Sequence, residues 1–157
     1  MNPKEEKTLI IMKPDAIQRN LFGEILQRFE RKGLKIIGVK MTKIGDVLLD
    51  EHYKHLKDKP FFNSLKNYMQ SSPVVLMALS GVNSISATRL IVGPTKGYEA
   101  DAGSIRGDYS LSGQSNLVHA SDSPENAEEE IKRFFNESEL FNYEKSDYKL
   151  IYSEDHF

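Results

Sequence analysis

The stretch Thr8-Leu9-Ile10-Ile11-Met12-Lys13 is a short apolar run that ends at Pro14-Asp15. A run of this kind, bounded by a turn signal, is typical of a buried β-strand. Over Phe22–Phe29, apolar residues recur at i, i+3, i+4 and i+7, which predicts an amphipathic helix that Gly33 is suited to end. The segment Leu34–Ile44 is rich in Ile, Val and Met and predicts a second strand. A β-α-β unit is therefore expected to open the chain.

The rest of the chain predicts, in order, two short helices, a strand, a helix, a long loop, a strand and a final helix. These elements are expected at Leu48–Leu56, Phe62–Met69, Pro73–Leu79, Ser84–Val92, Gly93–Gly113, Asn116–His119 and from Ser121-Asp122-Ser123-Pro124 onward. The order of elements predicts an α+β, ferredoxin-like sandwich, in which helices cover one face of a mainly antiparallel four-stranded sheet. The Gly-rich loop is a candidate functional segment, since long loops in compact domains usually carry function. After about Glu137 a polar, tyrosine-containing tail is expected to pack on the surface or on another subunit.

The length and net charge of the chain limit the number of domains and the kinds of partner to be expected. With 157 residues, the chain is expected to form one domain over 1–157. The formal net charge of −2 argues against a general attraction to nucleic acid or to anionic lipid. Any phosphate-binding site must therefore be built locally, from a few Lys and Arg side chains.

The absence of cysteine excludes disulfides, thiolate metal sites and cysteine nucleophiles, and it suits a reducing compartment. The segment Met1–Lys7 is polar, and no later apolar run approaches the roughly 20 residues that a membrane span requires. We therefore expect a cytoplasmic protein with no membrane partner.

His119 differs from the other histidines because it lies at the end of a predicted strand, directly before a capped helix start. Backbone N–H groups at such a junction favour anions. Glu130 follows at the edge of the apolar stripe of the next helix, between Ala127 and Phe134. A carboxylate that orients an imidazole is the arrangement expected behind a histidine nucleophile. Taken singly, a histidine such as His119 is more often structural, and Glu130 is equally well explained as one solvated member of an acidic run.

The octapeptide Asn116-Leu117-Val118-His119-Ala120-Ser121-Asp122-Ser123 resembles the active-site signature of nucleoside diphosphate kinases, in which the histidine is transiently phosphorylated. The resemblance covers nearly the whole chain, in order and at matching spacings. Its other blocks are Lys13-Pro14-Asp15, His52-Tyr53, Lys57-Asp58-Lys59-Pro60-Phe61-Phe62, Arg89, Gly93-Pro94-Thr95 and Gly103-Ser104-Ile105-Arg106-Gly107-Asp108. One tripeptide would carry little weight, but several blocks flanking a histidine make coincidence improbable.

The resemblance implies a role for each of these side chains. His119 would be the nucleophile, Glu130 and Ser121 would support it, and Tyr53 would sit beside it. The nucleotide would be held by the remaining residues: phosphate oxygens by Arg89, Thr95 and Arg106, the sugar hydroxyl and phosphates by Lys13, the ribose by Asn116, and the base by stacking on Phe61. Arginine forks match phosphate geometry, whereas lysine supplies a movable point charge. Taken alone, each residue also has an ordinary structural or surface explanation.

The resemblance implies that the γ-phosphoryl group of one nucleoside triphosphate passes to another nucleoside diphosphate, with ATP, GTP and other pairs as substrates, by a ping-pong mechanism through phosphorylated His119. Mg²⁺ would arrive on the nucleotide, because no aspartate cage for a metal is evident. A homo-oligomer, either a hexamer or a tetramer, is also implied.

Two alternatives remain open at this point. One is a non-catalytic nucleotide-binding regulatory module on the same fold. The other is a nucleotide kinase that transfers directly, although the chain has no Gly-x-x-x-x-Gly-Lys-Ser/Thr loop to hold its donor.

The chain also departs from the family pattern. Ala16 and Ala120 stand at positions that are usually glycine, Lys96-Gly97-Tyr98 follows Thr95, and Gln114-Ser115 precedes Asn116. The two alanines are small changes, whereas the departures at 96–98 and 114–115 leave loop rigidity, subunit contacts and assembly size open. They leave every proposed site residue in place.

Overall fold

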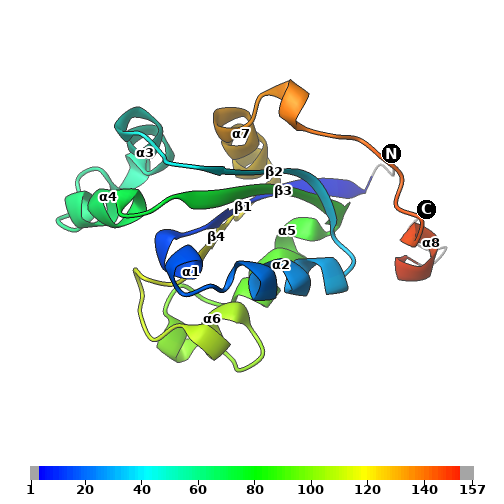
Figure 1. Ribbon diagram of the computed structural model, residues 1–157, viewed down its shortest axis with the longest axis horizontal. Coiled ribbons are helices and arrows are strands. Elements are labelled where there is room, and N and C mark those ends of the chain that lie inside the picture. The colour runs from blue at the N-terminus through cyan, green and yellow to red at the C-terminus, as the bar shows by residue number, and fades with distance from the viewer. Residues whose placement is uncertain (1–3, 153–157) are drawn as a thin grey trace.

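A four-stranded antiparallel sheet organises the protein, which is described here from a computed structural model over residues 4–152 (Figure 1). Its strands are β1 (Glu5–Met12), β2 (Lys35–Thr42), β3 (Val74–Val82) and β4 (Val118–Ala120), in the spatial order β2-β3-β1-β4. This confirms the predicted α+β, ferredoxin-like fold class. Met1–Pro3, from the polar segment at the start, and the last five residues of the predicted tail lie outside the described part.

Strand pairing positions the residues that matter later. Strand β1 is central and pairs with β3 from Glu5↔Val82 to Met12↔Val75. On its other side it pairs with the short edge strand β4, where Ile11 lies opposite His119. The histidine therefore sits beside the end of β1, from which the chain continues directly into Lys13.

Helices cover both faces of the sheet, which corrects the expectation of one covered face (Figure 1). One face packs against α3 (Asp46–His52), α4 (Phe62–Gln70) and α7 (Pro124–Phe134), and the other against α2 (Phe22–Arg31) and α5 (Ser84–Val92). Leu9 and Ile11 belong to the first core, whereas Ile10 and Met12 belong to the second. A strand buried on both faces has no polar alternation. Burial on both faces explains the unbroken apolar run in β1.

The helix ends follow the expected local chemistry. Helix α2 ends at Arg31, and Gly33 adopts a left-handed backbone with φ of 98°, a conformation that costs glycine little. At the start of α7, the side chain of Ser123 accepts a hydrogen bond from the backbone N–H of Asn126, and Pro124 occupies the first turn.

Several short elements were not predicted. Helix α1 (Pro14–Gln18) follows β1 directly, and the long Gly-rich loop contains a 3₁₀ turn, η2 (Gly97–Glu99), and α6 (Ile105–Tyr109). The first predicted helix after β2 ends at His52 and continues as a separate 3₁₀ turn, η1 (Lys54–Leu56). Elements of three to five residues are too short to show an apolar period. Of these four elements, only α6 has a side-chain cap, in which Ser104 accepts from the N–H of Gly107.

After α7 the chain forms η3 (Glu137–Glu139) and then α8 (Tyr148–Ile151), which lies far from α3 and α4 in Figure 1. The N–H of Phe141 donates to the carbonyl of Ile37 on β2, and the Tyr152 hydroxyl accepts from the N–H of Val82. The tail therefore packs on the surface of the protein. Within residues 4–152, no helix has the length and apolarity that crossing a membrane demands.

Candidate active site

A cleft of about 780 Å³ collects the predicted site residues from distant parts of the chain. All of them except Ser121 line it: Lys13, Tyr53, Phe61, Arg89, Thr95, Arg106, Asn116, His119 and Glu130. They come from the end of β1, the segment between α3 and α4, α5, α6, β4 and α7. The sheet and its two helical layers therefore converge on one opening.

His119 is held from behind by a carboxylate. Its Nε2 lies 3.0 Å from Oε1 of Glu130, and the hydroxyl of Ser121 donates to the other oxygen of Glu130 at 2.5 Å. Ser121 is fully buried and also accepts from the N–H of Leu9 at 3.0 Å, which ties the carboxylate to strand β1. Glu130 therefore belongs to the cleft, and the interpretation of it as a solvated member of an acidic run is wrong.

The charge of Glu130 decides which nitrogen of His119 is free. Burial acts to raise the pKa of Glu130, but the hydrogen bonds from His119 and Ser121 and the charge of His119 outweigh it, so the pKa is lowered. An ionised carboxylate has no proton to donate, so Nε2 of His119 must carry the hydrogen in their contact. In the neutral imidazole, Nδ1 then keeps its lone pair.

The ring packed directly against His119 is that of His52, not that of Tyr53. The two imidazoles meet edge-on at 4.7 Å, and Tyr53 packs edge-on against His52 at 4.6 Å. Burial and then the charge of His119 lower the pKa of His52 to about 3, so His52 is neutral at physiological pH. The sequence alone suggested no role for His52. Its place one helical turn after the buried Leu49 was the available signal.

One group of described residues has the composition of a metal site. Donor atoms of His52, His119 and Glu130 lie within 4.8 Å of one another. Two imidazoles and a carboxylate suit zinc, whereas magnesium prefers oxygen ligands. However, Nη1 of Arg133 lies 3.5 Å from Nδ1 of His52, and this guanidinium opposes a second cation there.

Lys13, Asn116 and Arg106 form the buried, positively charged side of the cleft. Nζ of Lys13 donates to Oδ1 of Asn116 at 2.7 Å, and the amide nitrogen of Asn116 donates to the carbonyls of Thr95 and Gly113. Burial, followed by the charge of Arg106, lowers the pKa of Lys13 to about 7. These contacts hold the lysine and the amide at a fixed distance from each other.

Arg106 also has a structural role, apart from any contact with a ligand. Its guanidinium donates to the backbone carbonyls of Asn116, Gly93 and Val118 at 3.1, 2.9 and 2.5 Å. It therefore joins the loop after α5 to the strand that carries His119. Burial and then the charge of Arg89 lower the pKa of Arg106 to about 10, so it remains a cation.

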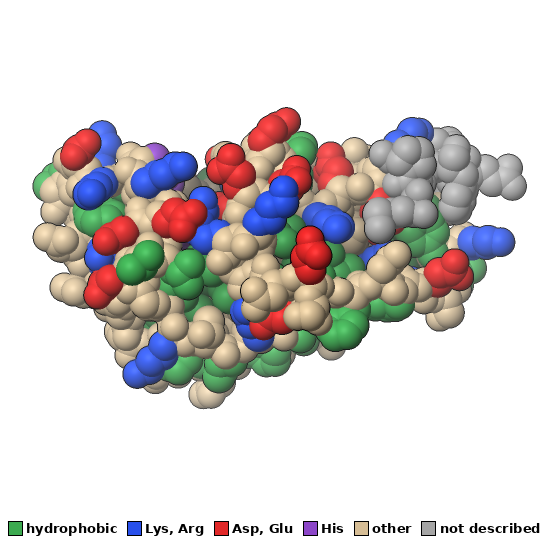
Figure 2. All heavy atoms as spheres, turned by 90° about the horizontal axis from the view of Figure 1, so that it is seen from above, with side chains coloured by type: hydrophobic (Ala, Val, Ile, Leu, Met, Phe, Trp, Pro, Cys, Tyr) green, Lys and Arg blue, Asp and Glu red, His purple; other side chains and the backbone are tan. Residues whose placement is uncertain are grey.

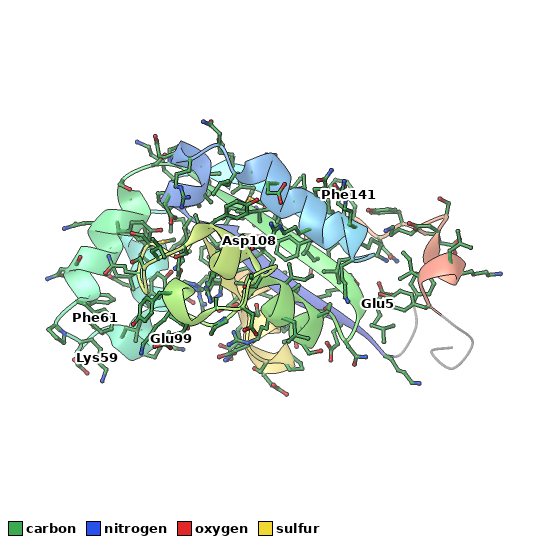
Figure 3. All side chains as sticks on the ribbon, turned by 90° about the horizontal axis from the view of Figure 1, so that it is seen from below. Glu5, Lys59, Phe61, Glu99, Asp108 and Phe141 are labelled. Carbon is green, nitrogen blue, oxygen red and sulfur yellow. The ribbon has the colours of Figure 1, made fainter. Side chains whose placement is uncertain are left out.

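Arg89, Thr95 and Phe61 lie at the exposed mouth of the cleft. Phe61 leaves 46% of its surface exposed, although it is a large aromatic residue. In Figure 3 it lies beside Lys59 at the end of the molecule opposite Glu5. An exposed aromatic ring at the rim of a cationic cleft offers a flat ligand a stacking surface.

A profile of the family "Nucleoside diphosphate kinase" matches residues 6–140 of this chain. The chain belongs to the nucleoside diphosphate kinase family. A nucleoside diphosphate kinase of Parabacteroides distasonis is 51% identical over 152 residues, covering 97% of this chain and 99% of the relative. One of Methanothermobacter thermautotrophicus is 50% identical over 149 residues, covering 95% and 99%.

Solved structures agree with the family assignment. The nucleoside diphosphate kinase of Halobacterium salinarum in complex with CDP superposes with a TM-score of 0.92 at 38% identity, covering 94% of this chain and 99% of that one. A nucleoside diphosphate kinase family protein of Babesia bovis gives a TM-score of 0.90 at 42% identity, with the same coverage. As a nucleoside diphosphate kinase, the protein is a nucleotide-binding phosphotransferase. The non-catalytic alternative is not favoured.

The charged surface agrees with a local phosphate site rather than a general polyanion surface. Figure 2 shows Lys and Arg side chains intermingled with Asp and Glu side chains over the face that carries α7. Many of the basic groups on the surface are paired, as Lys132 is with Glu128 and Lys66 with Asp50. The buried side chains of Lys13 and Arg106 instead line the cleft.

Proposed function

We propose that the phosphoryl group travels through Nδ1 of His119. Nδ1 attacks the γ-phosphorus of a nucleoside triphosphate, the P–N bond forms, and the bond from the γ-phosphorus to the β–γ bridging oxygen breaks. The diphosphate leaves with that oxygen, and a second nucleoside diphosphate later takes the group back by the reverse step. Glu130 supports this sequence because it holds the hydrogen on Nε2 and offsets the positive charge that develops on the ring as Nδ1 bonds to phosphorus.

The cationic side of the cleft would align the phosphates. Because phosphoryl transfer has a loose transition state, catalysis comes mainly from positioning and from neutralising charge on the equatorial oxygens. Arg89, Arg106 and Lys13 supply the charge, and Thr95 adds a hydroxyl. Asn116 and Lys13 would meet the sugar hydroxyls. The base would stack on Phe61. The Halobacterium relative was solved in complex with CDP, which supports nucleotide binding by this chain.

We further propose that Mg²⁺ enters as part of the nucleotide substrate. The only described metal-ligand set in residues 4–152 is His52, His119 and Glu130, which suits magnesium poorly. An ion carried on the β- and γ-phosphates needs no cage of protein carboxylates.

The wider setting is also a proposal. The 157 residues would act as a single domain in the cytoplasm, where the absence of cysteine suits a reducing environment. The protein would work as a homo-oligomer, either a hexamer or a tetramer. Val39 and Met41, which are 54% and 61% exposed on the edge strand β2, support self-association.

One experiment tests the central claim. After incubation with γ-labelled ATP and Mg²⁺, the protein should carry a label that acid removes and base does not, as expected for phosphohistidine. His119→Ala should remain folded and unlabelled, whereas His55→Ala, at an exposed histidine, should keep the label. A labelled His119→Ala protein, or sequential rather than ping-pong kinetics in the wild type, would refute the mechanism.

A further inference from the structure

Leu117 lies between Asn116 and the proposed nucleophile His119, and its backbone is left-handed, with φ of 73°. Its side chain is fully buried in the core. An L-residue other than glycine adopts this conformation only when its surroundings hold it there. The conformation also sets the direction in which Asn116 and His119 leave the turn.

The segment that follows β1 forms hydrogen bonds with both the N–H and the carbonyl of Leu117. Oδ2 of Asp15 accepts from the N–H of Leu117 at 3.1 Å, and the N–H of Lys13 donates to the carbonyl of Leu117 at 2.8 Å. Oδ1 of Asp15 accepts a short hydrogen bond from the hydroxyl of Tyr68 on α4. The carboxyl group therefore connects α1, α4 and the strand that carries His119.

Asp15 also faces the two buried cations of the cleft. Its charge acts to raise the pKa of Lys13 and of Arg106, against burial and against the repulsion between cations. Arg106 in turn binds the carbonyls of Asn116 and Val118, the residues on either side of Leu117. The same carboxyl group thus holds the turn and offsets the charge of the groups that surround it.

We propose that Asp15 is a positioning residue for phosphoryl transfer: through Leu117 it fixes His119 relative to Asn116, and it provides the counter-charge for Lys13 and Arg106. Asp15 does not line the cleft, so it acts through these neighbours rather than by touching the nucleotide. The proposal rests on the proposed function of His119 and adds a residue to it.

Two substitutions separate charge from geometry. Asp15→Asn keeps the size of the side chain and removes the charge, and the rate of His119 phosphorylation by ATP should fall about tenfold or more, the scale known for residues that orient a ligating histidine. Tyr68→Phe keeps the charge and removes one hydrogen bond to the carboxyl group, so a smaller loss of roughly two- to fivefold is expected. The control is Asp50→Asn, which makes the same charge change in the surface pair with Lys66, and it should stay within about twofold of the wild type.

The pH profile distinguishes positioning from a general loss of structure. The charged groups that face Lys13 are Arg106 from α6 and Asp15 from α1, so removing Asp15 leaves only the repulsive one and moves the pKa of Lys13 below about 7. The factor by which Asp15→Asn phosphorylates His119 more slowly than the wild type should therefore increase from pH 6 to pH 8. A loss of phosphorylation rate that is the same at every pH, or a rate within threefold of the wild type, would overturn the proposal.

Residue-resolved hydrogen exchange of Asp15→Ala gives a measurement that does not depend on activity. The Leu117 amide should exchange about tenfold faster or more, while the amide of Met77 in the central strand β3 should change little. Unchanged Leu117 exchange in the folded variant would overturn the proposal. If the wild type took no label from ATP, the proposed function would fail, while the exchange rates would still report on the contact between Asp15 and Leu117.

Discussion

Glu130→Gln changes one oxygen to nitrogen in the group behind His119 and removes its charge. The substitution disrupts a charge-assisted hydrogen bond of 3.0 Å to Nε2, made by a carboxylate whose side chain is only 13% exposed. Hydrogen bonds to charged groups contribute about 1.5 to 3 kcal/mol, and each 1.36 kcal/mol is a factor of ten in rate. The rate of phosphohistidine formation should therefore fall by roughly 10- to 150-fold. Rapid-quench measurement with labelled ATP reports this step separately from turnover.

The neighbouring glutamate provides the control. Glu129 is also at the cleft and on the same helix, but it is exposed, and within the described residues it forms no hydrogen bond or ion pair with His119. Glu129→Gln has the same change in charge and nearly the same helix propensity, so its rate should stay within about threefold of the wild type. Equal rates for the two variants would show that the imidazole does not depend on Glu130, and the assignment of Nδ1 as the nucleophile would lose its support.

Three further predictions follow from the cleft. Arg89→Ala and Arg106→Ala should each lower the rate of phosphoryl transfer by about 10². Only Arg106→Ala should also lower the Tm, by roughly 6 to 12 °C, because it removes three hydrogen bonds to backbone carbonyls; equal melting curves for the two variants would contradict this. Lys13 must be charged to bind phosphate, and its pKa is about 7, so kcat/KM should fall as the pH rises above about 7. Bound phosphate raises the pKa of Lys13, so kcat should persist to higher pH. A flat kcat/KM profile from about pH 6 to 9 would exclude this role. Stacking on the exposed Phe61 tolerates every base, so ADP, GDP, CDP and UDP should all be accepted, with kcat/KM values within about two decades of one another. A strict preference for one base in a coupled assay would refute the stacking role of Phe61.

Local sequence determined the parts of the structure that depend on short-range chemistry. The apolar run of β1, the helical period of α2 and the cap at Ser123 are each signalled by a few neighbouring residues, and all three are found where they were expected. The fold class followed from the order of these elements. The identity of the proposed nucleophile followed from the residues around His119, together with the resemblance that they carry.

Tertiary structure alone decided which side chains meet. The pairing of Glu130 with His119 requires α7 to lie over β1 and β4, and the contact of His52 with His119 joins residues that are far apart in the sequence. The free nitrogen of His119 depends on the lowered pKa of Glu130, and the depressed pKa of Lys13 depends on burial beside Arg106. The left-handed backbone of Leu117 is held by Asp15 from a different element. A pKa and a strained backbone are set by the surrounding charges, burial and hydrogen bonds, and these exist only once the chain has folded.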